Sequence, residues 1–476
     1  MFTRRTLFKN IINVSAGMAL TPSLRSFAAT RPVFALTLGK AEPVKIPSNF
    51  IGLGYEMSSV ATPDLLSAAN DRYVRLVKGI GPEGVLRVGG IVADYTRYEA
   101  SGKAMAEPKD TVITRERLDQ FNGFLKKIGW STIWSVNFAQ GTLDDAVKEA
   151  RAVASVLGPR LLALEIGNEV ENYAHGNNAF RKAPYTYENY RSEYNKWHDA
   201  ILKAVPGVRF AAPDTAGSVE WVERMAKDAN GDVQLLTTHY YRGGQKQGSA
   251  EQLLYPNPRL RNSLERLRAA ANTSGIPWRM CETNSFSGGG LPTVSDTFLG
   301  ALWTLDFMLL LATSGCAGVN IETGVNQLGF VSSYSPIQDD GKGDNRAGIP
   351  YYGMLAFAEA RQGCTEAMPI DVPEPAANIT AYALGSGGKV HSAVLINRGE
   401  SDLHLSVTGI GLTRPYATRL LAPSISSTTD VTFGGAAVDE SGHWAATKID
   451  RVHGADVLLP KMSAVVLGCS FDRYLA

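Results

Sequence analysis

Short apolar runs alternate along the chain with longer segments in which apolar residues recur every three to four positions. The runs are apolar on both faces, as in parallel strands covered by helices. Eight such strands are expected at 50–57, 85–88, 132–137, 161–166, 209–212, 233–239, 278–282 and 318–322. Helix-period segments between them include 115–128, 143–157, 187–204, 250–273 and 295–313. This alternation predicts an α/β fold with a (β/α)8 barrel.

The pattern changes beyond about Pro369, where apolar and polar residues alternate in short segments. The segments lie at 379–384, 390–396, 404–407, 417–421 and 463–467, with Gly, Ser, Asp and Pro between them. This is typical of an antiparallel β-sandwich. A further strand at 33–38 would join it and make the second domain discontinuous. We therefore expect a barrel at 46–365 and a sandwich built from 29–45 and 366–476.

The first 28 residues have the layout of an export signal. Arg4 and Arg5 open a twin-arginine-like pattern, an apolar stretch covers 11–20, and Ser26-Phe27-Ala28 fits a cleavage site. The apolar stretch is too short to span a membrane. The alternative is an ordinary basic start to the fold. The complete three-part order favours export to the periplasm or beyond in a bacterium, with no membrane insertion.

Composition and charge exclude several classes of partner. The chain has 476 residues, 44% of them hydrophobic, and a formal charge of +1. Without residues 1–28, 43 basic and 46 acidic residues remain, so nothing suggests nucleic acid or an anionic membrane. The cysteines show no CxxC spacing, so neither a disulfide framework, a metal site nor a cofactor is indicated. They are Cys281, Cys316, Cys364 and Cys469. The oligomeric state does not follow from these patterns.

Two glutamates stand at the ends of expected strands. Glu169 follows the fourth strand and Glu282 closes the seventh. Residues just past strand ends line the functional rim of such a barrel, so both carboxyls are expected there. A solvated loop glutamate is the alternative for Glu169, whereas an unpaired charge beside buried Cys281 would be costly. A facing carboxyl pair acts on sugar acetals as acid/base and nucleophile, which points to a retaining glycosidase.

Several motifs carry a family resemblance. Asn168-Glu169 and a glutamate ending strand seven resemble the clan A retaining glycosidases. The segment 279–290, together with Thr238-His239-Tyr240-Tyr241 and the segment 86–90, looks like glycoside hydrolase family 79, the β-glucuronidases and heparanases. The similarity covers about 51–363 and, more loosely, the sandwich. It implies that Glu169 is the acid/base and Glu282 the nucleophile.

The resemblance also assigns supporting roles. Tyr241 would donate a hydrogen bond to Glu282, His239 would support the pair, and Arg87 would pair with Glu282. The Asn168 amide suits a sugar 2-hydroxyl. For an isolated His-x-Tyr pair, a satisfied place in the core would be the simpler interpretation. The neighbouring motifs favour a functional role.

Substrate recognition depends on the group at C6 of the sugar. Backbone amides of Gly288 and Gly289 suit a uronate carboxylate, and Tyr334 is the tyrosine that the resemblance implies beside them. Rim positions suited to sugar hydroxyls are Glu56, Asp94 and Gln140. Each of these groups has a plain loop role as its alternative.

The sequence therefore predicts a retaining exo-β-glucuronidase acting on glucuronide-containing carbohydrate. An endo-acting heparanase-like enzyme and a non-catalytic carbohydrate-binding barrel are the alternatives. A polyanion cleft should be rich in Lys and Arg, and the net charge of the chain beyond residue 28 favours exo action. The fold alone does not separate an enzyme from a binding protein.

Overall fold

The structure is a computed structural model that describes residues 33–175, 179–229, 231–324, 332–339, 343–373, 378–412 and 414–468. The expected export segment at 1–28 and Cys469 lie outside the described residues. From Val33 onward the chain forms one compact unit, so its contacts do not divide the barrel from the sandwich. Within the described part, no helix is both long and apolar enough to cross a membrane.

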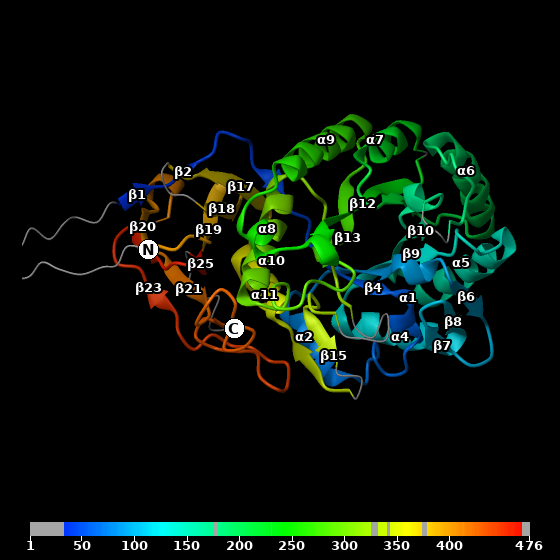
Figure 1. Ribbon diagram of the computed structural model, residues 1–476, viewed down its shortest axis with the longest axis horizontal. Coiled ribbons are helices and arrows are strands. Elements are labelled where there is room, and N and C mark those ends of the chain that lie inside the picture. Colours follow the sequence, from blue (N-terminus) through cyan, green and yellow to red (C-terminus); the bar gives the residue numbers. More distant parts are fainter. Residues whose placement is uncertain are drawn as a thin grey trace, which may run out of the picture. The chain divides into compact units, whose positions relative to one another are not determined.

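Eight parallel strands close into a barrel, as the alternating pattern predicts (Figure 1). They are β4 (Ile51–Glu56), β5 (Val85–Gly89), β9 (Ser131–Val136), β10 (Leu161–Ile166), β11 (Phe210–Thr215), β12 (Val233–Gly244), β13 (Trp278–Ser287) and β14 (Val319–Glu322). β12 and β13 extend five residues past their expected ends because they stay paired as far as Gly244 and Ser287. This extension carries Tyr241 above the barrel rim.

Helices surround the barrel strands (Figure 1). The longer ones are α2 (Asp71–Gly79), α4 (Arg115–Ile128), α5 (Leu143–Leu157), α6 (Tyr187–Ala204), α7 (Val219–Asp228), α9 (Pro258–Ser274), α10 (Phe298–Thr313) and α11 (Ile349–Arg361); the short ones are α1 (Met57–Ala61), α3 (Gly90–Ala93) and α8 (Ala250–Leu254). The helix expected at 250–273 is two helices. Asn257 caps α9 and Pro258 occupies its first turn, so the chain breaks there.

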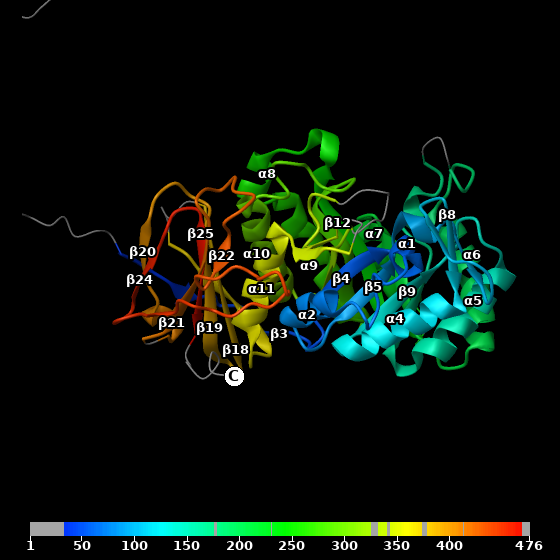
Figure 2. The same cartoon turned by 90° about the horizontal axis from the view of Figure 1, so that it is seen from below.

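The region after the barrel forms two β layers, which Figure 2 shows. One sheet contains β2 (Thr37–Leu38), β3 (Val44–Lys45), β17 (Glu366–Asp371), β18 (Ile379–Ser386), β19 (Lys389–Asn397), β21 (Tyr416–Leu421), β22 (Thr432–Phe433), β23 (Asp450–Arg451) and β25 (Ser463–Gly468). The other contains β1 (Val33–Ala35), β20 (Leu403–Ser406) and β24 (Asp456–Leu459). Apolar side chains such as Leu395, Leu405 and Val465 form one buried cluster between the layers.

The N-terminal strand expected at 33–38 joins this sandwich in two pieces. The chain crosses between the sheets at buried Leu36, so β1 pairs with β20 and β2 pairs with β17. The β1–β20 pair is parallel, which departs from the antiparallel expectation. Alternation alone does not reveal a strand that changes sheets.

Two small sheets lie at the barrel rim. β6 (Thr96–Glu99), β7 (Met105–Glu107) and β8 (Asp110–Thr114) form one, and β15 (Ile337–Asp339) with β16 (Asn345–Ala347) forms the other. Short 3₁₀ turns lie at Gly158–Arg160, Val170–Asn172, Gln245–Gln247 and Thr408–Ile410. The turn at Val170–Asn172 follows Glu169 directly.

Candidate active site

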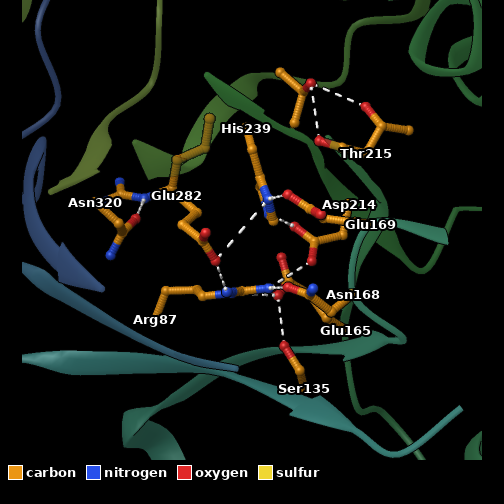
Figure 3. Close-up of polar contacts among 12 residues, drawn as sticks. Arg87, Ser135, Glu165, Asn168, Glu169, Asp214, Thr215, His239, Glu282 and Asn320 are labelled. Atoms are coloured by element: carbon orange, nitrogen blue, oxygen red, sulfur yellow. Dashed lines mark hydrogen bonds and ion pairs between the residues drawn. The ribbon is translucent and has the colours of Figure 1, made fainter. Parts of the chain in front are cut away.

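Arg87 on β5 is the centre of a buried polar network (Figure 3). Its Nη1 donates to Oε2 of Glu282 at 2.7 Å, and its Nε donates to Oε2 of Glu165 at 3.0 Å. Its Nη2 donates to Oδ2 of Asp214 at 2.6 Å and to Oδ1 of Asn168 at 2.8 Å. One planar guanidinium therefore orients four groups that come from three other strands or their ends.

Glu282 on β13 is held from two sides. Its residue is 9% exposed, and its Oε1 accepts a hydrogen bond from the Tyr241 hydroxyl at 2.8 Å. Burial, and then the charge of Glu282, raise the pKa of Tyr241 well above its ordinary value. Tyr241 therefore stays a donor. With Arg87 on the other oxygen, Glu282 is fixed as an oriented carboxylate.

Glu169 lies opposite Glu282 and is more open to solvent. Beyond β10 the chain turns through Gly167 at φ +93°, and Glu169 itself has φ +48°. This left-handed conformation is rare for a side chain larger than glycine and is common at functional sites. The Glu169 side chain is 33% exposed. One oxygen of Glu169, one oxygen of Glu282 and a ring nitrogen of His239 all lie within 4.8 Å of one another.

His239 joins the two glutamates to Asp214. Its Nδ1 is 3.3 Å from Oε1 of Glu169 and 3.9 Å from Oε2 of Glu282, and its Nε2 is 2.9 Å from Oδ1 of Asp214. Burial lowers the pKa of His239, but the carboxylates of Asp214 and Glu282 outweigh it and raise that pKa well above its ordinary value. His239 is therefore an imidazolium at neutral pH and donates from both nitrogens.

Asp214 and Glu165 belong to the network but were not among the sequence predictions. Burial favours the neutral form of Asp214, yet Arg87 and His239 lower its pKa to about 2. Burial and then the Asp214 charge raise the pKa of Glu165 to about 7. The available signal was position, since Asp214 ends the fifth strand and Glu165 lies inside the fourth.

Two clusters of side chains have possible ligand atoms within 4.8 Å of one another, which is the spacing of metal ligands. One consists of Glu169, His239 and Glu282, and the other of Glu165, Asp214 and Cys281. In both clusters the carboxylates already pair with cationic side chains of the protein: Arg87 donates to Glu282, Glu165 and Asp214, and His239 lies 3.3 Å from Glu169.

Two more buried glutamates border Glu282. Glu56 ends β4, and its Oε2 accepts a hydrogen bond from Val92 N of α3 at 2.8 Å. Burial and then the charge of Glu282 raise the pKa of Glu56 to about 8. Glu322 ends β14 opposite Gly54, and among the described residues neither of its oxygens has a hydrogen-bond partner. Glu56 was expected at the site from the sequence, and Glu322 was not.

Asp94 lies close to the backbone beside Glu169, whereas Gln140 lies away from the carboxyl pair. Asp94 accepts a hydrogen bond from the Tyr173 hydroxyl at 2.6 Å, and that hydroxyl accepts one from Asn168 N at 3.2 Å. Asp94 thus supports the backbone beside Glu169. Gln140 is exposed and lines a separate cavity of about 300 Å³ with residues of β6 and α5. No described contact joins Gln140 to the carboxyl pair.

The glycine loop and Tyr334 come together beside Tyr241. Gly288, Gly289 and Gly290 have φ of +83°, +91° and +84°. Ser333 N donates to the Gly289 carbonyl at 2.7 Å, which fastens the loop to the segment carrying Tyr334. The Tyr334 ring stacks 6.3 Å from that of Tyr241. The Gly290 N–H donates to the Phe286 carbonyl at 3.1 Å, so Gly288 and Gly289 are the amides left to consider for a ligand.

No protein-family model matches the chain. A curated protein named β-glucuronidase from Aspergillus niger is 26% identical over 353 residues, which cover 64% of this chain and 62% of that protein. A protein of the same name from Neurospora crassa is 26% identical over 329 residues, 60% of this chain and 57% of that protein. The chain therefore matches about three fifths of the length of these relatives.

Solved structures share the fold over most of the chain. A 4-O-α-L-rhamnosyl-β-D-glucuronidase from Fusarium oxysporum 12S, in complex with Rha-GlcA, aligns with a TM-score of 0.75 at 17% identity. That alignment covers 91% of this chain and 100% of the other. A family 51 α-L-arabinofuranosidase from Bifidobacterium longum aligns with a TM-score of 0.66 at 16% identity, over 93% and 100% of the two chains. These likenesses establish a barrel with a β-sandwich.

Proposed function

We propose that this protein is a retaining exo-β-glucuronidase that hydrolyses terminal β-D-glucuronides through a covalent glycosyl-enzyme intermediate. The observation that carries the proposal is the Glu169–Glu282 pair, which has one oxygen of each residue within 4.8 Å, with Glu282 on β13 and Glu169 just past β10. Retaining enzymes hold their carboxyls about 5–5.5 Å apart, whereas inverting enzymes leave roughly 6.5–9.5 Å for a water. The two curated relatives named β-glucuronidase support the same reaction class.

In the first step Glu282 attacks the anomeric carbon and the aglycone oxygen departs. Arg87 and Tyr241 each donate to one oxygen of Glu282, so its carboxyl group is oriented before substrate arrives. Glu169 donates its proton to the leaving oxygen. Its exposed side chain suits this role, because the aglycone leaves toward solvent.

In the second step Glu169 acts as a base. It removes a proton from water, whose oxygen attacks the anomeric carbon and displaces the Glu282 carboxylate. His239 Nδ1, 3.3 Å from Oε1 of Glu169, helps to hold this carboxyl group in place. Two inversions at one carbon retain the β configuration. Asn168, whose Oδ1 accepts from Arg87 Nη2, is the residue we assign to the sugar 2-hydroxyl.

Recognition of the uronate is assigned to Gly288, Gly289 and Tyr334. The Gly288 and Gly289 amides would supply two donors, and Tyr334, whose segment is fastened to this loop by the bond from Ser333 N to the Gly289 carbonyl, lies beside them. A glucoside presents a hydroxymethyl group there and leaves donors unsatisfied, which can cost a factor of about 10⁴ in rate. Glucuronide should therefore be strongly preferred.

The test is hydrolysis of p-nitrophenyl β-D-glucuronide beside the matching glucoside and a heparan polymer, with NMR detection of the first anomer released. We expect glucuronide turnover with β-glucuronate appearing first. Glu282→Gln should be inactive, whereas Glu169→Ala should retain activity on aryl glucuronides and be rescued by azide to a β-glycosyl azide. An α product would reject retention. Equal glucoside turnover would reject the substrate, and internal polymer cleavage would favour endo action.

A further inference from the structure

A second cavity of about 70 Å³ lies on the opposite face of β12 from the candidate active site. Successive side chains of a strand point to opposite sides, so Tyr241 faces Glu282 while Tyr240 and Arg242 line this cavity. Its other walls come from α8, α9, α10, the sandwich strand β18 and the residue that follows β19. None of the proposed catalytic groups borders it.

Arg398 is the unusual group in this cavity. It directly follows β19 and is 3% exposed. Its Nη1 donates to Oδ2 of Asp306 on α10 at 2.8 Å, whereas its Nε and Nη2 are buried and have no hydrogen-bond partner among the described residues. Buried guanidinium donors without acceptors are costly, so an acceptor from outside the chain would be stabilised there.

Asp306 has little capacity left for Arg398. Its Oδ1 already accepts from the Thr380 hydroxyl at 2.6 Å and from the Tyr382 hydroxyl at 2.9 Å. Arg242 and Arg261 line the same cavity, so three guanidinium groups face one carboxylate. The cavity therefore has an excess of positive charge and favours an anion.

Aromatic side chains indicate which kind of anion. Trp303, Phe307 and Tyr240 stack in series, with ring centres 4.9 Å and 5.3 Å apart. Tyr255 also lines the cavity and is 54% exposed. The volume of about 70 Å³ has room for a few waters or a carboxylate, which is too little for a whole sugar ring. A ring would instead rest against the exposed face of Tyr255.

We propose that this cavity is a second carbohydrate site that binds the carboxylate of a uronic acid residue in an acidic glycan. Arg398 receives the carboxylate through its free Nε and Nη2, which form the paired donor edge that suits two oxygens. Arg261 adds charge at the mouth. Such a site holds a glycan on the protein without entering the catalytic cleft.

Affinity gel electrophoresis tests the site with β-linked polyglucuronate, and with hydroxyethylcellulose as a neutral polymer of the same backbone. Polyglucuronate should retard the full chain, and hydroxyethylcellulose should not. Arg261→Gln and Tyr255→Ala, both at exposed positions, should each weaken retardation roughly fivefold. Turnover of p-nitrophenyl β-D-glucuronide should not change. Arg259→Gln is the matched control, because this exposed arginine of α9 does not line the cavity.

Glu282→Gln separates this site from the catalytic cleft. Its retardation should equal that of the unaltered chain, even though its hydrolysis is lost. The proposal is overturned if the unaltered chain is not retarded, if Arg261→Gln and Tyr255→Ala migrate like Arg259→Gln, or if Glu282→Gln loses retardation. Failure of the proposed glucuronidase activity would be seen separately, as absence of aryl glucuronide hydrolysis.

Discussion

A balance of charges explains how so many ionisable groups share one barrel interior. Arg87 and the imidazolium of His239 supply two positive charges, and Asp214 and Glu282 supply two negative ones. Glu165, with its pKa raised to about 7, can remain protonated below that pH. A buried ionic cluster is stable only when its charges are paired, and this arrangement pairs them.

Glu322 is the residue whose protonation most directly affects Glu282. Burial, and then the charges of Glu282 and Glu56, raise the pKa of Glu322 well above its ordinary value, although Arg87 and His239 oppose them. The folded protein therefore favours the protonated form of Glu322. Ionisation at higher pH would place a second negative charge beside the nucleophile and disturb its pairing with Arg87.

Glu322→Gln imitates the neutral acid and does not titrate. We expect kcat/KM near pH 6 to change by less than about tenfold, and the alkaline limb of the kcat/KM profile to move to higher pH. Glu220→Gln, at an exposed position of α7, is the control and should leave the profile unchanged. Loss of activity at every pH would mean that an ionised Glu322 is required.

Elements were easier to predict from the sequence than the contacts between them. The eight barrel strands follow from runs apolar on both faces. Glu169 and Glu282 follow from the ends expected for the fourth and seventh strands, although β13 continues past Glu282 to Ser287. The sequence did not reveal Asp214, because its role depends on lying 2.6 Å from Arg87, a residue 127 positions away. Gln140 was expected at the site because it follows the third strand, yet its side chain lines a separate cavity. Only tertiary packing determines such pairings.

The turn from β5 into α3 has no room for an added methyl group. Gly90 has φ +69°, and a Cβ at this position would collide with the carboxyl group of Glu56. Gly90→Ala should therefore lower kcat/KM at least tenfold by displacing Glu56, and lower the free energy of unfolding by about 1–3 kcal/mol. Enzyme kinetics and urea titration measure the two effects.

Gly275→Ala is the matched control for this turn. Gly275 ends α9 with φ +72°, and a Cβ there would meet nothing within 4 Å. Gly275→Ala should lower the free energy of unfolding by about 1 kcal/mol through backbone strain and leave kcat/KM unchanged. If both variants lose activity equally, the collision with Glu56 is not the cause.

At the scale of the whole molecule, buried carboxyls link stability to pH. Burial raises the pKa of Glu149 from 4.5 to about 7, against a 2.7 Å hydrogen bond from Trp134 Nε1 that lowers it. Glu165 and Glu56 are raised to about 7 and about 8. In each case the folded chain holds its proton more tightly than the unfolded chain. Their contribution to stability is complete below about pH 4.5 and is lost as pH rises through the folded pKa.

Glu149 allows this linkage to be measured away from the catalytic cluster. A rise from 4.5 to about 7 corresponds to about 3 kcal/mol. The free energy of unfolding in urea should therefore fall between pH 5 and pH 8, and Glu149→Gln should reduce that fall by about 3 kcal/mol because glutamine has no proton to lose. Its amide oxygen can still accept from Trp134. For Glu220→Gln, a substitution on the surface, the free energy of unfolding should fall as far as it does for the unaltered chain. Parallel curves for Glu149→Gln and the unaltered chain would show that Glu149 ionises in the folded protein at no cost, and would place the pH dependence on Glu165 and Glu56.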